Sequence, residues 1–525
     1  MTLQVSVDDT GLQPVVDACA AEDTVARIWA EDPTVWTDPV EPEVSDRLGW
    51  LHLSETSRPL IPTIEALASA ARDEGVTKVV LLGMGGSSLA PETFAASFPR
   101  VDGYPTLTVL DSTHPDAISH ASESIDPAST WFVVSSKSGG TLETMSLFEH
   151  FWASTSSASS TPGQQFIAVT DPGSSLEELA TDRRFRAIVL ADPNVGGRYS
   201  ALTAFGLVPA GLIGIDLTRL LNAAQTAENR CKPTIPLVEN PGFMAGALMG
   251  ARSVDGNRVV YFEASKPAEE LPAWAEQLIA ESTGKEGRGI LPVAGGPRPA
   301  TASATAVAVG GSNVPDADIS ITFDDPYDIA GAMFVLEFAT AVAGSIIGIH
   351  PFDQPDVQLA KKLAHEAMTG SLESTGDDLI DSVAAATEIR SLVEAEPSYV
   401  AIQAYVEPTP ETMSGLFELA ETISARFDTF VTVGVGPRFL HSTGQLHKGG
   451  FAGGVYVQLI DQPSTSLNLP GADFSFNDLI RGQADGDAAA LAARQRSVIR
   501  VDLGDAPTAR LVALTAALQP SEEAG

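Results

Sequence analysis

The sequence predicts an α/β fold of doubly wound parallel sheets with helical additions at both ends. Three observations predict it. Short apolar runs alternate with segments of helical periodicity along most of the chain. The runs are almost wholly apolar, as strands covered by helices on both faces must be. Polar, glycine-rich segments follow several runs, at the edge where open parallel sheets bind ligands.

The first α/β unit is expected over residues 45–232. Its strands are predicted at residues 78–82, 107–110, 131–134, 166–169 and 187–190. Segments such as 141–154 and 174–180 lie between them, with apolar residues at helical spacing and Ser or Asp near their starts. Strands and helices therefore alternate, as a parallel sheet requires.

The pattern restarts after Lys232, and a second α/β unit is expected over residues 233–465. Helices are predicted at 242–254, 269–282 and 333–347, and strands at 259–263, 305–309, 319–323, 399–406, 430–435 and 455–460. Residues 1–44 form an N-terminal extension and residues 466–525 a C-terminal one, both expected to be helical or irregular.

Charge and composition exclude several classes of protein. The 525 residues carry 31 Lys and Arg against 68 Asp and Glu, a net charge of −37 that disfavours nucleic acid and anionic membranes as partners. No apolar stretch is expected to reach the ~18–20 residues that span a bilayer, and the start lacks a secretory pattern. Two cysteines cannot build a disulfide framework or a structural zinc site. We expect a cytoplasmic protein.

Two glycine-rich segments follow predicted strands. In the first, Gly83, Gly85 and Gly86 precede Ser87 and a helix, so free backbone N–H groups and the helix dipole favour an anion. The segment lacks the third glycine of a dinucleotide fingerprint and the Gly-Lys-Ser/Thr of a Walker A loop.

The second segment offers hydroxyl, charged and glycine groups to an anion. They are Ser136, Lys137, Ser138, Gly139, Gly140 and Thr141. Taken alone it could be an ordinary turn with a serine N-cap. Two such loops at the same edge of one sheet favour a ligand site over two ordinary turns. Neither loop has acidic residues at metal-ligand spacing, so a phosphate bound without metal is expected.

Other polar residues stand at positions suited to a cleft. Arg198 follows two glycines and can approach a ligand, although it could equally pair with a carboxylate. Gln277 and Glu281 share one face at a helix end, whereas Glu276 and Glu286 are expected to be solvated surface charges. Gln354 and Lys361 are seven residues apart, on one side of a predicted helix.

Together these segments resemble the phosphoglucose isomerase family, from about residue 45 to residue 450. The matching motifs are Gly85-Gly-Ser87, Ser136-Lys-Ser-Gly-Gly-Thr-Leu-Glu143, Gly196-Gly-Arg-Tyr-Ser200, Glu281-Ser-Thr-Gly-Lys285 and Phe352-Asp-Gln-Pro355 with Lys361. The chain is most similar to the isomerase portion of bacterial bifunctional transaldolase–isomerases. No transaldolase region precedes it, so we expect a free-standing isomerase.

The resemblance implies two sugar-isomerase domains and a role for each motif. Glu281 would be the base, Arg198 the cation near the reacting carbons, and Lys361 and His441 the ring-opening residues. The substrate and its phosphate would be bound by Gly86, Ser87, Ser136, Lys137, Ser138, Thr141, Gln277 and Gln354. No metal or cofactor is expected, and a homodimer is expected from the family alone.

Two departures from the family pattern bear on these roles. The histidine segment follows the Phe-Asp-Gln segment instead of preceding it, so His350 and His447 are rivals of His441 for ring opening. Gly140 stands where the family usually has a second threonine, which removes one hydroxyl from the phosphate loop.

The predicted reaction is the interconversion of glucose 6-phosphate and fructose 6-phosphate through a cis-enediolate. A single carboxylate can move the proton between C1 and C2, and a fixed cation can stabilise the charge that develops. The alternatives are an isomerase that also accepts mannose 6-phosphate and a non-catalytic sugar-phosphate regulator. The joint presence of Glu281, Arg198 and Lys361 favours catalysis over regulation.

Overall fold

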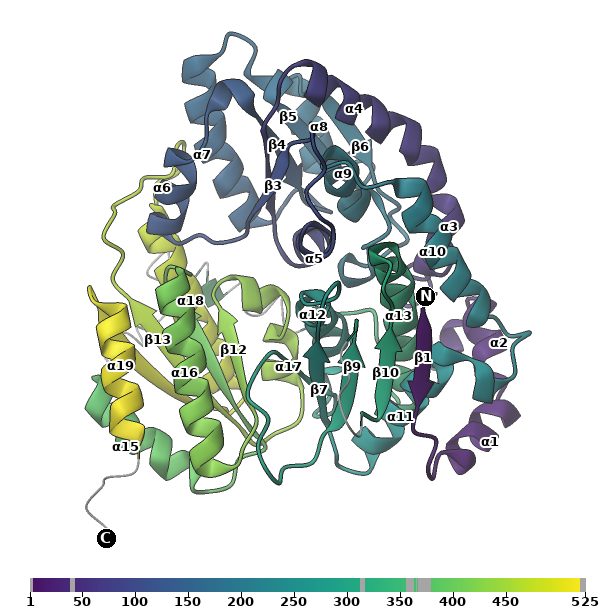
Figure 1. Ribbon diagram of the computed structural model, residues 1–525. Helices are drawn as coiled ribbons and strands as arrows, with labels where there is room; N and C mark the ends of the chain where they lie inside the picture. The colour runs from purple at the N-terminus through teal and green to yellow at the C-terminus, as the bar shows by residue number, and fades with distance from the viewer. Residues whose placement is uncertain are drawn as a thin grey trace.

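A computed structural model describes residues 3–37, 43–311, 317–355, 363, 364, 366 and 379–519. Its strands form three sheets, each covered by helices (Figure 1). The predicted α/β class is confirmed. The sequence predicted two sheets, and the third sheet corrects that prediction.

The first unit contains a five-stranded parallel sheet of order β3-β2-β4-β5-β6. Each predicted strand is present within one residue at either end, because most of the apolar runs are bounded by polar or glycine residues. The strands are β2 (Lys78–Gly83), β3 (Thr106–Leu110), β4 (Thr130–Ser135), β5 (Phe166–Thr170) and β6 (Ala187–Leu190). The helices are α3 (Leu53–Thr56), α4 (Ile61–Asp73), α5 (Leu89–Ser97), α6 (Pro115–Glu123), α7 (Leu142–Ala158), α8 (Ser175–Asp182), α9 (Ala204–Leu212) and α10 (Leu217–Arg230).

The strand order of this sheet determines where a ligand can enter. The chain leaves β2 for β3 on one side and then crosses to β4 on the other, so the order reverses between β2 and β4. Loops diverge at such a point and leave a crevice beyond the carboxyl ends of the strands. Both glycine-rich segments of the sequence begin there.

The second sheet has the order β1-β10-β9-β7-β8, parallel except for β1. Its strands are β1 (Gln4–Val7), β7 (Val259–Ala264), β8 (Leu291–Ala294), β9 (Thr305–Val309) and β10 (Ile319–Thr322), and its helices are α1 (Gln13–Ala21), α2 (Thr24–Trp29), α11 (Pro241–Val254), α12 (Leu271–Thr283) and α13 (Ile329–Ile347). The N-terminal extension is therefore not only helical, because β1 pairs antiparallel with β10.

The third sheet is parallel, with the order β12-β11-β13-β14. Its strands are β11 (Tyr399–Tyr405), β12 (Val431–Val435), β13 (Gly454–Asp461) and β14 (Ser497–Gly504), and its helices are α15 (Ser382–Val393), α16 (Pro410–Phe427), α17 (Gly444–Gly449), α18 (Phe476–Ala493) and α19 (Pro507–Leu518). We call residues 379–519 the third unit. In all three sheets the parallel strands follow one order: the second strand along the chain lies at the edge, next to the first, and the third and fourth follow on the other side of the first.

The third unit corrects two predicted boundaries. The stretch predicted as one unit over 233–465 contains parts of two sheets, because apolar strands carry no signal of which sheet they join. The predicted C-terminal extension from residue 466 supplies β14, which pairs with β13 along its length. That extension therefore belongs to the third sheet.

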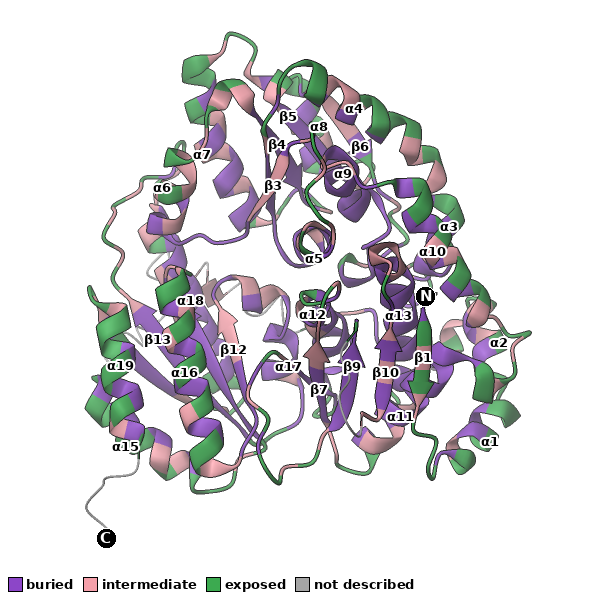
Figure 2. Ribbon diagram, in the orientation of Figure 1, coloured by how far each residue is buried: buried purple, intermediate pink, exposed green. Residues whose placement is uncertain are grey.

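The helix α13 corrects the expectation about apolar stretches. The segment Pro326–Ile347 has 22 residues and contains an 18-residue window with a mean hydropathy of 1.8, so it is long and apolar enough to cross a membrane. In the structure 89% of its 18-residue window is buried, and α13 packs on α10, α11 and α12 (Figure 2). A helix that is apolar on all sides can be the core of a large protein, and that is its place here.

Candidate active site

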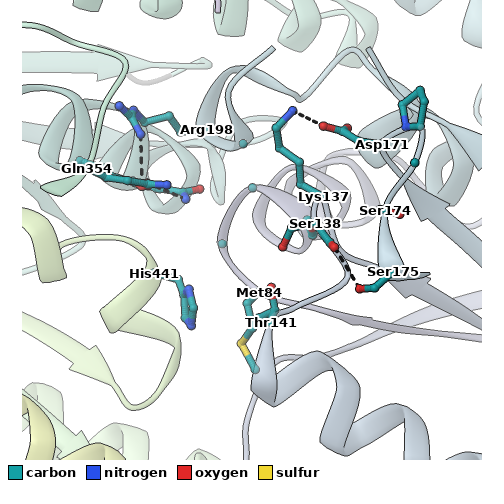
Figure 3. Close-up of a pocket in the computed structure, with 18 residues that line it drawn as sticks. Met84, Lys137, Ser138, Thr141, Asp171, Ser174, Ser175, Arg198, Gln354 and His441 are labelled. Carbon is teal, nitrogen blue, oxygen red and sulfur yellow. Dashed lines mark hydrogen bonds and ion pairs between the residues drawn. The ribbon is translucent and has the colours of Figure 1, made fainter. Parts of the chain in front are cut away.

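A cavity of about 590 Å³ lies beyond the switch point of the first sheet, between the three units. We call it the central cavity. Figure 3 shows side chains from all three units pointing into it. Ten of the twelve predicted site residues line it: Gly86, Ser87, Lys137, Ser138, Thr141, Arg198, Gln277, Glu281, Gln354 and His441. Lys361 lies outside the described residues.

The two glycine-rich segments, residues 83–87 and 136–141, form one wall of the cavity. We call them the first and the second anion loop. Thr141 precedes the 17-residue helix α7, so that the helix N-terminus and its positive dipole end face the cavity. The remaining predicted residue, Ser136, lies behind the loop with only 2% of its surface exposed. Its Oγ is 3.2 Å from Thr141 Oγ1 and accepts a hydrogen bond from the Gly139 N–H, so it holds the loop in shape.

Gly86 permits a close approach between two loops of the site. A Cβ atom at Gly86 would lie 2.0 Å from the carbonyl oxygen of Gly197, the residue before Arg198. No side chain fits at that distance. The first anion loop and the arginine loop are thus in direct backbone contact.

We expect Gly86→Ala to separate these loops. The variant should raise KM, lower kcat and cost about 1–3 kcal/mol of stability, as overpacking does. Steady-state kinetics and thermal unfolding measure the three effects. Gly196→Ala is the control, because a Cβ there has no atom nearer than 4.0 Å. Equal behaviour of the two variants would contradict the importance of this contact.

A third loop, after β5, was missed by the sequence analysis. Asp171, Ser174 and Ser175 line the cavity, and Asp171 Oδ2 accepts from Lys137 Nζ at 2.5 Å (Figure 3). Burial raises the pKa of the Asp171 carboxyl, and the Lys137 ammonium opposes that shift. The Lys137 ammonium is thus held beside the cavity by the Asp171 carboxylate. The sequence did contain a signal for this loop, because Asp-Pro-Gly-Ser-Ser directly follows β5, the neighbour of β4 in the sheet.

Glu281 is held by two partners at the end of α12. Gln277, one helical turn earlier, donates from Nε2 to Glu281 Oε2 at 2.9 Å. Arg198 Nη1 lies 3.2 Å from Glu281 Oε1. The Glu281 residue is only 6% exposed, and that exposure is toward the cavity. Both carboxylate oxygens are therefore fixed in orientation.

Arg198 is itself fixed by every part of its guanidinium group. Nε donates to Ser282 Oγ at 2.8 Å, and Nη2 donates to the carbonyl oxygens of Pro351 and Asp353 at 2.8 and 2.9 Å. The arginine thus links α12 to the loop that carries Gln354 into the cavity. Arg198 therefore does both things that the sequence left open: it pairs with a carboxylate, and it lines the cavity.

Lys285 also anchors the loop that leads to Gln354. Its Nζ donates to the carbonyl oxygens of His350 and Asp353 and to Asp353 Oδ1, at 2.5–2.8 Å. Burial, with the nearby charge of Arg198, lowers the pKa of Lys285 to about 8, and Asp353 opposes the shift. Lys285 therefore shapes the cavity without lining it.

His441 comes from the third unit, on a short 3-10 helix (Arg438–His441) after β12. Its Nε2 is 3.0 Å from Oε1 of Glu143, in the first turn of α7. Of its rivals, His350 is 3% exposed and accepts from the Phe352 N–H through Nδ1, and His447 is 2% exposed among tyrosines. Neither rival lines the central cavity.

Glu276 corrects another expectation, while Glu286 is exposed as predicted. Glu276 is half-buried and lines a second cavity of about 580 Å³ on the other side of α12. Burial raises the pKa of Glu276 to about 7, partly offset by a hydrogen bond from Ser442 Oγ. The cause is that α12 is packed between the units and has little free surface.

This shift predicts a pH-dependent stability. The folded-state pKa of Glu276 is above its unfolded value, so the folded state favours the protonated carboxyl. The contribution of this carboxyl to the free energy of unfolding is therefore complete below about pH 4.5 and is lost as the pH rises through about 7. The difference in Tm between Glu276→Gln and the unchanged protein should therefore grow in favour of the variant from about pH 5 to about pH 8. Glu286→Gln, at an exposed site, is the control. Parallel Tm curves for all three proteins would contradict the burial of this carboxyl.

Comparison with known proteins points to one family. A family model described as phosphoglucose isomerase matches residues 62–289. A glucose-6-phosphate isomerase of Rubrobacter xylanophilus is 28% identical over 399 residues, covering 62% of this chain and 90% of that protein. The matched family region ends before Gln354 and His441.

Two solved structures share the fold. A glucose-6-phosphate isomerase from Chlamydia trachomatis aligns with a TM-score of 0.61 at 18% identity, over 71% of this chain and 89% of that one. A hypothetical protein from Thermus thermophilus aligns with a TM-score of 0.58 at 22% identity, over 69% of this chain and 99% of that one.

Proposed function

We propose that this chain, which belongs to the phosphoglucose isomerase family, interconverts glucose 6-phosphate and fructose 6-phosphate. One observation carries the proposal. A buried carboxylate, Glu281, lies beside a fixed cation, Arg198, in the cavity that also contains both anion loops. An aldose–ketose isomerase needs these three elements together: a base, a charge to stabilise an enediolate, and a phosphate handle.

In this proposal the phosphate lies against Ser87, Ser138 and Thr141 at the N-terminus of α7, with Lys137 within reach. Its binding energy orients the sugar, and this remote energy can be used at the reacting carbons. The overall charge of −37 would repel a dianion, so the local cations and the helix dipole must oppose that repulsion.

Ring opening comes first, because hexose phosphates are mainly closed. His441 and Lys361 are the proposed acid–base pair for this step, Lys361 by family resemblance alone. Glu281 then removes the proton from C2 and returns it to C1, on one face of a cis-enediolate. Arg198 stabilises the negative charge on the enediolate oxygens, and Gln277 keeps the carboxylate aligned between the two carbons.

The proposal extends to the setting of the enzyme: the cytoplasm, glycolysis and gluconeogenesis, and a homodimer. Light scattering coupled to size exclusion tests the homodimer, which a monomeric mass would contradict.

The reaction is tested by coupling fructose 6-phosphate conversion to a glucose 6-phosphate assay, in metal-free buffer with EDTA. We expect fructose 6-phosphate to be converted at the same rate with and without EDTA. A parallel assay with mannose 6-phosphate detects the broader specificity. Absence of turnover with either substrate, combined with tight sugar-phosphate binding, would favour the non-catalytic regulator instead.

A further inference from the structure

We propose that Gln483 is a positioning residue for His441, and that the third unit thereby completes the ring-opening site. This rests on the proposed function. Gln483 belongs to α18, far beyond the region that the family model matches, and no motif of the sequence pointed to it.

Three contacts join Thr113, Gln483, Glu143 and His441 in a row. Thr113 Oγ1 donates to Gln483 Oε1 at 2.7 Å. Gln483 Nε2 donates to Glu143 Oε1 at 2.9 Å. The same Glu143 oxygen is 3.0 Å from His441 Nε2. These contacts form a continuous polar chain of four side chains that ends at the cavity.

The direction of this chain is set by chemistry. The Gln483 amide has one acceptor end and one donor end, and the Thr113 hydroxyl donates to the acceptor end. The NH₂ group therefore faces the Glu143 carboxylate. The reversed amide would place its oxygen against a carboxylate oxygen. Gln483 thus fixes the oxygen of Glu143 that His441 contacts.

Burial makes this arrangement specific. Thr113 is fully buried, Gln483 is 4% exposed and Glu143 is 7% exposed. In such surroundings a satisfied polar network holds one geometry, whereas an unsatisfied member costs free energy. The His441 side chain is 14% exposed and is the end that reaches the cavity.

The network also crosses between units. Thr113 follows β3 and Glu143 begins α7, both in the first unit, whereas Gln483 and His441 belong to the third. The helix α18 is held firmly, by a capping box at Ser475 and by an ion pair of 2.5 Å between its buried Asp487 and Lys448 of α17. A rigid helix can therefore set the position of a first-unit carboxylate relative to a third-unit histidine.

The test compares Gln483→Leu and Gln483→Glu with Gln403→Leu. Gln403 is a fully buried amide of the same unit, and its Nε2 lies 3.1 Å from Nδ1 of His447, which does not line the cavity. Both Gln483 variants should lower kcat about 10-fold, a part of the ~10²–10⁴-fold that an acid–base group supplies. The Glu variant keeps the volume and the Thr113 contact but repels Glu143. The control variant should keep kcat within about twofold, which corresponds to about 0.4 kcal/mol.

A second readout separates positioning from general damage. The affinity for arabinonate 5-phosphate, an open-chain acid that needs no ring opening, should be unchanged in both Gln483 variants, because the anion loops and Arg198 are intact. Normal kcat in both Gln483 variants, or an equal loss in Gln403→Leu, would overturn the proposal. Lack of turnover in the unchanged protein would instead refute the proposed function.

Discussion

Replacing Glu281 by Gln should abolish isomerisation while sugar-phosphate binding remains. Gln keeps the volume and can still accept from Gln277, but it cannot take a proton from C2. The loss in kcat should be roughly 10²–10⁴-fold, the contribution that general base catalysis typically makes. Steady-state kinetics measure the loss, and calorimetric titration with fructose 6-phosphate measures the binding.

The matched control is Glu276→Gln. Glu276 is on the same helix but faces the second cavity, so its conversion to an amide should leave kcat unchanged. Near-normal turnover in Glu281→Gln would refute the assignment of the base. A large loss in Glu276→Gln would show that the helix, and not the carboxylate, is what the first variant disturbs.

Replacing Arg198 by Lys should lower kcat by about 10²–10³-fold, the loss expected when a group that stabilises developing charge is removed. Lys keeps the charge, yet it cannot make the branched set of contacts that Arg198 makes with Glu281, Ser282 and two carbonyl oxygens. The loop before Gln354 would lose its anchor as well, so KM should also rise.

Arg288→Lys is the control for that substitution. Arg288 donates through Nη1 to the carbonyl oxygens of Ile347 and Gly348, at 2.8 and 3.0 Å, and does not line the central cavity. Its replacement should leave kcat unchanged. Equal losses in the two variants would mean that loop anchoring, and not stabilisation of the enediolate, explains the effect of Arg198.

The features that the sequence predicted well are local ones. The runs that became β2, β4 and β5 are apolar and bounded by polar residues, so their positions could be predicted from composition alone. The anion loops could be predicted because the residues that shape them are adjacent in the chain. Gln277 and Glu281 needed only the helical repeat.

The features that it missed depend on distant contacts. Strands β11 and β13 were located correctly but were assigned to the wrong sheet, because an apolar strand does not encode its neighbour. The burial of Glu276 follows from packing of α12 between units. The link between Glu143 and Gln483 joins residues 340 positions apart, which no local pattern reveals.

Transfer of label from C2 tests the central proposal most directly. With glucose 6-phosphate that carries deuterium at C2, the unchanged protein should deliver part of the label to C1 of fructose 6-phosphate and lose the rest to water. Glu281→Gln should do neither. Full retention of the label in the product, or loss of label to water at an unchanged rate in the variant, would contradict proton transfer by this carboxylate.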